Sequence, residues 1–209
     1  MRTAGFCILL LFARPLVPQD RGLLPQDIHP VILFRLPPVS PEDLDEQGRR
    51  LLAARTGYQP APGPAHISVD SPRELDLGIP SGENSPVGPR FFQLAVLIIA
   101  REIDQQYEWS SHELAGRRQG LEQSVIDVVK YNRGVDGLSK GDATLVTFGR
   151  TLFCQPRVSS ELWQKMVSLF GRQHTVQLMM IMGDYFRVGF MLNAVDQRLP
   201  PGARHCCRR

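Results

Sequence analysis

The sequence predicts an all-α domain that begins near residue 90. Apolar segments from Phe91 onward repeat with the spacing of helices, and glycine or serine residues that commonly end or start helices separate them. We find no internal repeat, and no run of alternating apolar and polar residues between turns, which would indicate a half-buried strand. We therefore expect a compact bundle of about six helices.

The segment upstream of this domain is predicted to hold one helix between two extended stretches. Seven prolines between residues 14 and 41 favour extended chain over helix or sheet. Ser40 is a suitable N-cap and Pro41 a suitable first helical residue, so a helix is expected through about residue 55. Residues 59–89 are again rich in Pro, Gly and Ser, which predicts a long loop.

The helices of the domain are expected in the order of its apolar segments. The first, over residues 91–103, is apolar on all sides and should be buried; a strand over residues 96–99 is the alternative, which the length of the segment disfavours. Ser139 and either Ser159 or Ser160 are the expected N-caps of two later helices. The other segments predicted to be helical are residues 108–119, 122–132 and 175–196.

Neither end of the chain predicts a membrane span. Asp184 and Arg187 interrupt the methionine-rich last helix, which is therefore expected in the core. Residues 4–13 resemble a short signal peptide, but they are too few to span a bilayer and lack a small-x-small cleavage site. Export and a cytosolic leader are the two interpretations of residues 1–34, and we favour a cytoplasmic protein.

Composition and cysteine spacing exclude two kinds of site. The formal net charge is only +3 and no basic stripe is interleaved with aromatic residues, so nucleic acid is not an expected partner. The four cysteines form no CxxC and no metal-binding spacing, and unpaired thiols are expected. Cys206 and Cys207 should be exposed in a mobile basic tail over residues 203–209.

The residues most suggestive of chemistry are Glu108 and His112, which are four positions apart. On a helix they would lie on one face, about 5–6 Å apart at Cβ. A carboxylate so placed can fix the tautomer of an imidazole and favour its protonated form, which prepares the pair to move protons. Tyr107 and Trp109 add aromatic bulk that could exclude water from it.

This stretch and its surroundings resemble the carboxymuconolactone decarboxylase-like family, within the wider alkylhydroperoxidase-like helical fold. The resemblance covers roughly residues 35–202, which we take as one domain with its helical core over residues 90–197. The residues that carry it are 101–102, 106–113, 115, 120–121, 148–150, 157–159, 169–171, 192–196 and 199–202, with 35–38 and 44–50 upstream.

The resemblance implies a subunit of a homotrimer or homohexamer that acts on a small molecule in the breakdown of aromatic compounds. The implied activity is that of a lyase, a carboxy-lyase acting on a small lactone or carboxylated organic substrate. His112 would donate or accept the proton and Glu108 would orient it. Trp109, Tyr107 and Glu102 are the candidate substrate contacts. The resemblance implies no organic cofactor and no metal.

The sequence departs from the peroxidases of the wider fold, which carry CxxCxxxH and a relay glutamate one helix earlier. When that pattern is aligned on His112, the cysteine positions fall on Gln105 and Glu108 and the glutamate position on Gln93. A thiol peroxidase would therefore lack its nucleophile and its resolving sulfur. Cys154 lies on another helix and is expected to be a small core residue.

Two other functions remain open alternatives to the lyase. An alkylhydroperoxidase-like antioxidant protein of peroxiredoxin type would have to rely on Cys154. A non-catalytic oligomeric scaffold is favoured by Gln93 and by the short, Pro-rich segment over residues 65–89, where family members usually have a helix.

Several of the candidate residues also have a purely structural interpretation. A buried Glu–His hydrogen bond is common in helical cores, and for Trp109 packing in the core or at a subunit interface is expected before substrate stacking. Glu102 is equally consistent with an ion pair to its neighbour Arg101. Glu113 is expected at solvent or a subunit contact. Asp184 and Tyr185 could line the site, although a pair between Asp184 and an arginine is the favoured interpretation.

Overall fold

The computed structural model describes residues 82–203 without a break, together with Cys206 and two upstream groups of residues. The upstream groups are residues 24, 26 and 28–33, and residues 42, 44–46 and 49–50. These described parts contain helices and no strand, which confirms the predicted all-α class.

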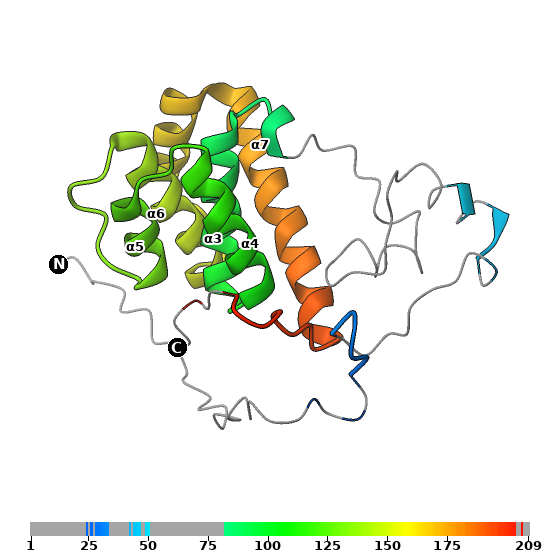
Figure 1. Cartoon of the computed structure of the whole chain (residues 1–209). Helices are drawn as coiled ribbons and strands as arrows, with labels where there is room; N and C mark the ends of the chain where they lie inside the picture. Colours follow the sequence, from blue (N-terminus) through cyan, green and yellow to red (C-terminus); the bar gives the residue numbers. More distant parts are fainter. Residues whose placement is uncertain are drawn as a thin grey trace.

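Five α-helices follow a short 3₁₀ helix within residues 82–203 (Figure 1). Their bounds agree with the predicted helices to within a few residues. They are η3 (Gly82–Asn84), α3 (Pro89–Glu102), α4 (Gln106–Arg118), α5 (Gln123–Lys130), α6 (Lys140–Cys154) and α7 (Ser160–Ala194).

Helix α3 is the centre of the bundle, and α4, α5, α6 and α7 all pack against it. Its residues 92–101 are all buried. This agrees with the prediction from its all-round apolar surface, and the alternative of a strand over residues 96–99 is wrong. Because α3 contacts every other helix, a side chain on it can meet α4 and α7 at the same point.

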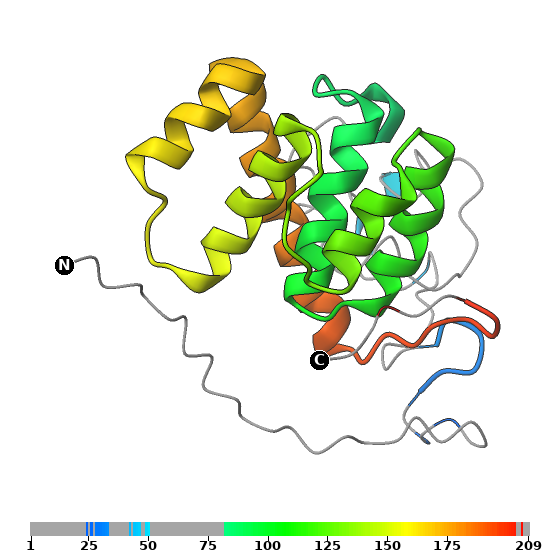
Figure 2. The same ribbon diagram turned by 90° about the vertical axis from the view of Figure 1, so that its left-hand side faces the viewer.

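Helix α7 consists of two helical segments that meet at Gly171, whose φ of 75° and ψ of 162° are not helical. Side chains rarely tolerate this positive φ, so glycine is the residue that allows the break. The chain turns sharply there, and the first segment projects away from the second (Figure 2). The prediction of two helices in this region was correct, but the chain passes from one to the other within a single residue instead of a loop.

The predicted serine N-caps are present. Ser159 Oγ accepts the backbone N–H of Leu162 at the start of α7. Ser139 Oγ accepts the backbone N–H of Asp142, 3.1 Å away, and donates to the Asp142 carboxylate at 2.7 Å. Asp142 is thereby held at the start of α6, where it is buried.

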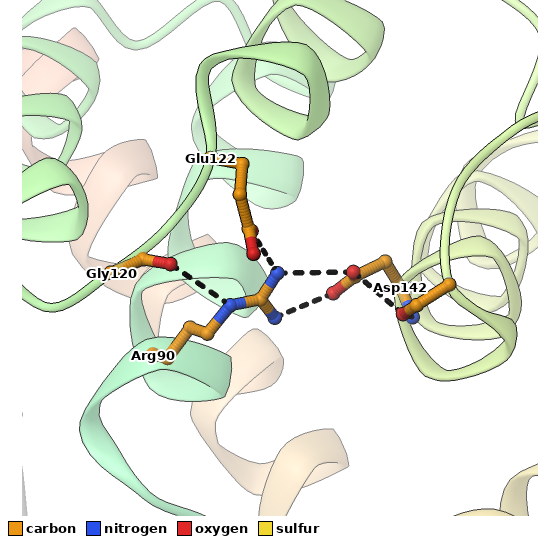
Figure 3. A network of polar contacts seen from close by, with 5 residues as sticks. Arg90, Gly120, Glu122 and Asp142 are labelled. Carbon is orange, nitrogen blue, oxygen red and sulfur yellow. Dashed lines mark hydrogen bonds and ion pairs between the residues drawn. The ribbon is translucent and has the colours of Figure 1, made fainter.

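Arg90, at the start of α3, binds this aspartate and two residues of the α4–α5 connection (Figure 3). Its Nη1 and Nη2 donate to the two carboxylate oxygens of Asp142 at 2.7 and 3.0 Å. Its Nε donates to the carbonyl of Gly120 at 3.2 Å, and Nη2 also binds the exposed Glu122. The arginine therefore ties α3 to the α4–α5 connection and to α6.

Two glycines, Gly149 of α6 and Gly189 of α7, allow these helices to pack closely against α3 and the residue that follows it. A Cβ at Gly149 would lie 2.5 Å from Cγ2 of Ile98 and 3.2 Å from Cε of Met182. A Cβ at Gly189 would overlap Cδ1 of Ile103. The second contact brings Tyr185, one helical turn before Gly189, beside the central helix.

Part of the segment that we assigned to the leader packs against the end of the domain. Ile32 is fully buried, and the backbone N–H of Arg198 donates to the carbonyl of Leu33 at 3.0 Å. The Gln197 side chain also donates to the carbonyls of Ile32 and Leu33, at 3.5 and 3.4 Å. We call this contact of residues 28–33 with Gln197 and Arg198 the terminal clasp; it is visible where the blue segment meets the end of α7 (Figure 1).

The structure corrects two expectations about cysteines. Cys206 is buried in the main hydrophobic cluster, and its backbone N–H donates to the Gln106 side chain at 2.7 Å, so it is neither exposed nor loosely placed. Cys154 is exposed at the end of α6, where a core residue was expected. In both cases long-range packing, which the sequence spacing does not encode, decides the burial.

Several predictions fall mostly or wholly outside the described residues. These are the apolar stretch 4–13, most of the loop 59–89, Cys207, and most of the upstream helix. Of that helix, Glu46, Arg49 and Arg50 are helical. Among the described helices, none combines the length and the apolar character needed to cross a bilayer.

Candidate functional site

Glu108 and His112 meet on one face of α4, as their spacing predicts. The helix starts after Gln105, whose side-chain oxygen accepts the backbone N–H of Tyr107 at 2.7 Å. One turn of helix then places Glu108 Oε2 3.2 Å from His112 Nε2. The side chains are 5% and 15% exposed, so the carboxylate is covered while the imidazole keeps an edge at the surface.

Gln93 of α3 holds the other side of the imidazole. Its Oε1 lies 2.6 Å from His112 Nδ1. A carbonyl oxygen can only accept, so Nδ1 carries a hydrogen and donates it. A neutral ring with a hydrogen on Nδ1 has only a lone pair on Nε2, which would repel an ionised Glu108. The Glu108–His112 contact therefore requires one proton between the two groups.

Two aromatic rings enclose the imidazole. Tyr185 of α7 lies edge-on to it with ring centroids 5.0 Å apart, and Phe92 of α3 lies 6.1 Å away. The Phe92 and Tyr185 rings also contact each other edge-on at 5.7 Å. The site is thus built from α3, α4 and α7, with apolar surface around a polar centre.

The phenols near this centre remain protonated at neutral pH. Burial raises the pKa of Tyr185 above its usual value, and the negative charges of Glu108 and Asp184 add to the effect. Burial, followed by the charge of Glu108, likewise raises the pKa of Tyr107. Both hydroxyls therefore stay neutral beside the Glu108 carboxylate.

Among the residues of the site, Tyr185 is the one whose position the sequence predicted least clearly. Asp184 pairs with Arg187 through a 2.6 Å contact, which confirms that part of the interpretation, while Tyr185 reaches the imidazole. The signal that could have separated them is helical phase. All the neighbours of Tyr185 three and four positions away on α7 (Ile181, Met182, Val188 and Gly189) are buried, whereas only Ile181 and Val188 are buried among those of Asp184.

Trp109, a candidate substrate contact, is a core residue instead. Its exposed fraction is 0%, and its indole N–H donates to Glu113 Oε2 at 2.7 Å. Lys130 lies over its ring, 5.9 Å from the centroid. These contacts fit the packing interpretation of Trp109, because a ring that is covered on all sides offers no surface to a substrate.

Glu113 is buried, and the expectation of a solvent or subunit contact for it was wrong. Its carboxylate accepts hydrogen bonds from Trp109 and from Arg117, the latter at 2.6 Å, and Lys130 lies 3.7 Å away. Burial alone would raise the pKa of Glu113, but the hydrogen bonds from Arg117 and Trp109 and the charge of Lys130 outweigh it and lower the pKa. These partners stabilise a buried charge. Glu113 lies one helical turn after the buried Trp109, so helical phase places it on the buried face of α4 although its charge suggested solvent.

The other two candidate contacts differ in position. Tyr107 is half-buried and close enough to Glu108 to sense its charge. Glu102 lies at the end of α3, nine residues after Gln93. At 3.6 residues per turn and 1.5 Å per residue, it is on the opposite side of the helix and about 13 Å further along. The structure thus brings Tyr107, but not Glu102, to the Glu108–His112 pair.

Gln105, which aligns with the first peroxidase cysteine, makes its side-chain hydrogen bonds to α4 and α7 and not to the imidazole. It caps α4, and its amide donates to Asn193 Oδ1 of α7 at 2.8 Å. Within the described parts of the chain, no three His, Cys, Asp or Glu side chains converge as metal ligands would.

One carboxylate oxygen of the site has no hydrogen-bond partner. Glu108 Oε1 is buried and has no hydrogen-bond partner, whereas Oε2 faces His112. Buried polar atoms nearly always have a partner, so an exception of this kind requires an explanation.

Comparisons with known proteins do not assign the chain: no family model matches it, and no curated protein is found to be similar.

Proposed function

We propose that this chain is a carboxymuconolactone decarboxylase-like protein, a cofactor-independent acid–base lyase acting on a small lactone or carboxylated organic substrate. The observation that supports this most directly is the line of polar groups from Gln93 through His112 to Glu108. It holds one transferable proton in a largely apolar setting, which is what general acid–base catalysis needs. The family resemblance around residues 101–113 points to the same chemistry.

In the proposed reaction the bond between a carbon atom and its carboxylate breaks, and CO₂ leaves. The electron pair stays on the carbon as an enolate-type carbanion, and a proton from the Glu108–His112 pair completes the product. Gln93 keeps the imidazole in one orientation throughout, because Nδ1 is held by its hydrogen bond. The rings of Phe92 and Tyr185 limit the access of water to the proton.

A His112→Gln variant tests this function. We expect CO₂ release from carboxymuconolactone, the compound for which the family is named, to fall by about 10²–10⁴-fold, the usual contribution of a general acid or base. His174→Gln removes a histidine outside the site and should leave the rate unchanged. If the His112 variant matches the wild type in turnover, His112 is not catalytic and the proposed function fails.

The proposed homotrimer or homohexamer has a suitable surface on α7. Large apolar side chains three, four or seven positions apart are exposed along its second segment, and Phe190 is the most exposed at 68%. Exposed apolar side chains gathered on one helix face, an apolar strip, often mark a protein–protein contact. The strip consists of Val176, Met179, Met180, Phe186 and Phe190, and Phe153 of α6 packs beside Phe186.

A charge placed in this strip should dissociate the oligomer. We expect the wild type to run in size-exclusion chromatography with light scattering at a multiple of the 23.5 kDa chain mass, and Phe190→Asp to run at the mass of one chain. Leu114→Asp is the matched control, because Leu114 is exposed on α4, outside the strip. A wild-type protein of one chain mass would contradict the proposed oligomer.

A non-catalytic scaffold is the second candidate. It is favoured by the small exposed fraction of the Glu108–His112 pair, which would suit a structural hydrogen bond. The His112→Gln variant separates the two, because a scaffold would lose stability but has no turnover to lose. The exposed position of Cys154 is what favours the antioxidant alternative, and a sulfenic acid trapped on Cys154 after peroxide treatment would support it.

A further inference from the structure

The exposed face of the second segment of α7 has the residue spacing of a helix that packs against another helix. Ile181 and Leu192 are buried on the opposite side of this segment, which packs on α3 and α6 at the edge of the bundle (Figure 1). The exposed positions follow one another at intervals of three, four, three and four residues, the heptad spacing of paired helices. We call this row the seam; it consists of Val176, Met179, Gly183, Phe186 and Phe190.

Gly183 lies at the middle of the seam, and the described part of the chain does not explain why it is a glycine. Its backbone is helical, and a Cβ built on it would meet no described atom within 4 Å. Glycine inside a helix is less favourable than alanine, so this position carries a cost without a benefit to the single chain. A second helix that crosses at Gly183 supplies the benefit, because two helices approach most closely where the side chains between them are smallest.

The seam is complementary to itself when two copies of α7 run in opposite directions and cross at Gly183. Val176 and Phe190 each lie seven positions from Gly183, so each would face the other across the pair. Met180, which is exposed beside the seam, and Phe186 each lie three positions from Gly183 and face each other in the same way. Every phenylalanine ring thus meets a smaller or more flexible side chain, which fills the contact without overlap. Two copies that ran in the same direction would instead place ring against ring.

The charges along this segment also favour the antiparallel direction. Arg172 is exposed and has no ion-pair partner among the described residues. It lies eleven positions before Gly183, and Ala194, the last residue of α7, lies eleven positions after it. An antiparallel pair therefore brings each Arg172 to the carbonyl end of the other helix, where a positive charge is stabilised. A parallel pair would bring the two arginines together.

We propose that two copies of this chain pair through the second segments of α7, antiparallel and on a two-fold axis at Gly183. This inference rests on the oligomer of the proposed function and specifies its contact. In a two-fold contact both copies use the same surface, as the seam does. Of the two proposed assemblies, only the homohexamer can contain two-fold axes. The assembly is then a hexamer of three α7 pairs, in which the other contacts join one pair to the next.

Two charge substitutions test the direction of the helices. Val176→Glu and Phe190→Lys each place a charge against an apolar residue of the other copy, and we expect size-exclusion chromatography with light scattering to give the mass of one chain for either variant. In Val176→Glu/Phe190→Lys the new side chains have opposite charges and face each other at both ends of an antiparallel pair, so we expect the mass of a hexamer again. The two positions are about 21 Å apart along one helix, so they cannot pair within a chain.

A substitution at the crossing point tests the close approach of the two helices. Gly183→Met adds bulk without charge, and because a side chain there meets no described atom, we expect circular dichroism to show a folded chain. Two methionine side chains would collide at the two-fold axis, and we expect association to weaken by at least about tenfold in sedimentation equilibrium. Ser111→Met is the matched control, since it makes a small exposed residue of α4 larger outside the seam and should leave association unchanged.

The possible results separate this inference from the proposed function. A wild-type trimer, a Gly183→Met protein that associates as strongly as the wild type, or a double variant that stays at the mass of one chain each overturn the antiparallel pair. A wild type of one chain mass overturns it together with the proposed oligomer, and would show that another segment of the chain or another protein covers the seam. None of these results alters the turnover test on His112, which by itself decides whether the Glu108–His112 pair is catalytic.

Discussion

Replacing Arg90 with methionine is expected to lower the free energy of unfolding by about 3–5 kcal/mol, the usual cost of leaving a buried charge without its partner. The Asp142 side chain is only 3% exposed and receives two hydrogen bonds from Arg90. Methionine fills a similar volume but donates nothing, so the carboxylate would keep only its contacts at the start of α6. Urea denaturation followed by circular dichroism measures the change.

Two further variants identify the origin of this loss. Arg90→Met combined with Asp142→Asn removes the uncompensated charge and should recover a substantial part of the stability. Glu122→Gln removes the exposed partner of Arg90 and should cost less than about 1 kcal/mol, as exposed ion pairs do. An Arg90→Met protein as stable as the wild type would show that the network of Figure 3 contributes little to folding.

Replacing Trp109 with alanine is expected to destabilise the protein by about 3–5 kcal/mol through the cavity left by a large buried ring. The variant also removes the indole donor to Glu113, a buried carboxylate. Trp109→Phe keeps most of the ring but not the donor, and should cost about 1–3 kcal/mol. Chemical denaturation of the two variants thus separates the packing contribution from that of the hydrogen bond.

The second tryptophan provides the control. Trp163 is 38% exposed on the first segment of α7, and Trp163→Ala should change stability by much less than Trp109→Ala. Equal losses at the two positions would argue against a core role for Trp109. Since Trp109 contacts Glu113 and Lys130 and not the imidazole, we also expect Trp109→Phe to retain the turnover attributed to His112.

The helices could be predicted because their signals are local. The apolar run of α3 and the serine caps at Ser139 and Ser159 depend on residues within a few positions of one another. The pairing of Glu108 with His112 is local in the same way, since one turn of helix determines it. Two helices were expected over the region of α7, the second from about residue 175, but the break at Gly171 itself was not predicted.

Apart from the burial of Glu113, whose partners Trp109 and Arg117 are four residues away, the features that were missed depend on residues distant in sequence. Arg90 finds its partners 30 and 52 positions away, and only the folded bundle brings them together. Tyr185 reaches His112 because α7 packs closely on α3, and Cys206 is buried because the chain returns to α4. Helical phase within one segment does not specify which neighbouring helix will cover a given face.

The terminal clasp has a consequence for how this chain is made. Gln197 and Ile32 are 165 positions apart, so residues 28–33 leave the ribosome long before their partners exist. At typical rates of 5–20 residues per second, that interval is roughly 10–30 s. Throughout it Ile32 has no burial site at the end of α7, and the clasp closes only after Gln197 and Arg198 have been synthesised. Synthesis of the residues that follow α7 therefore determines when residues 28–33 become protected.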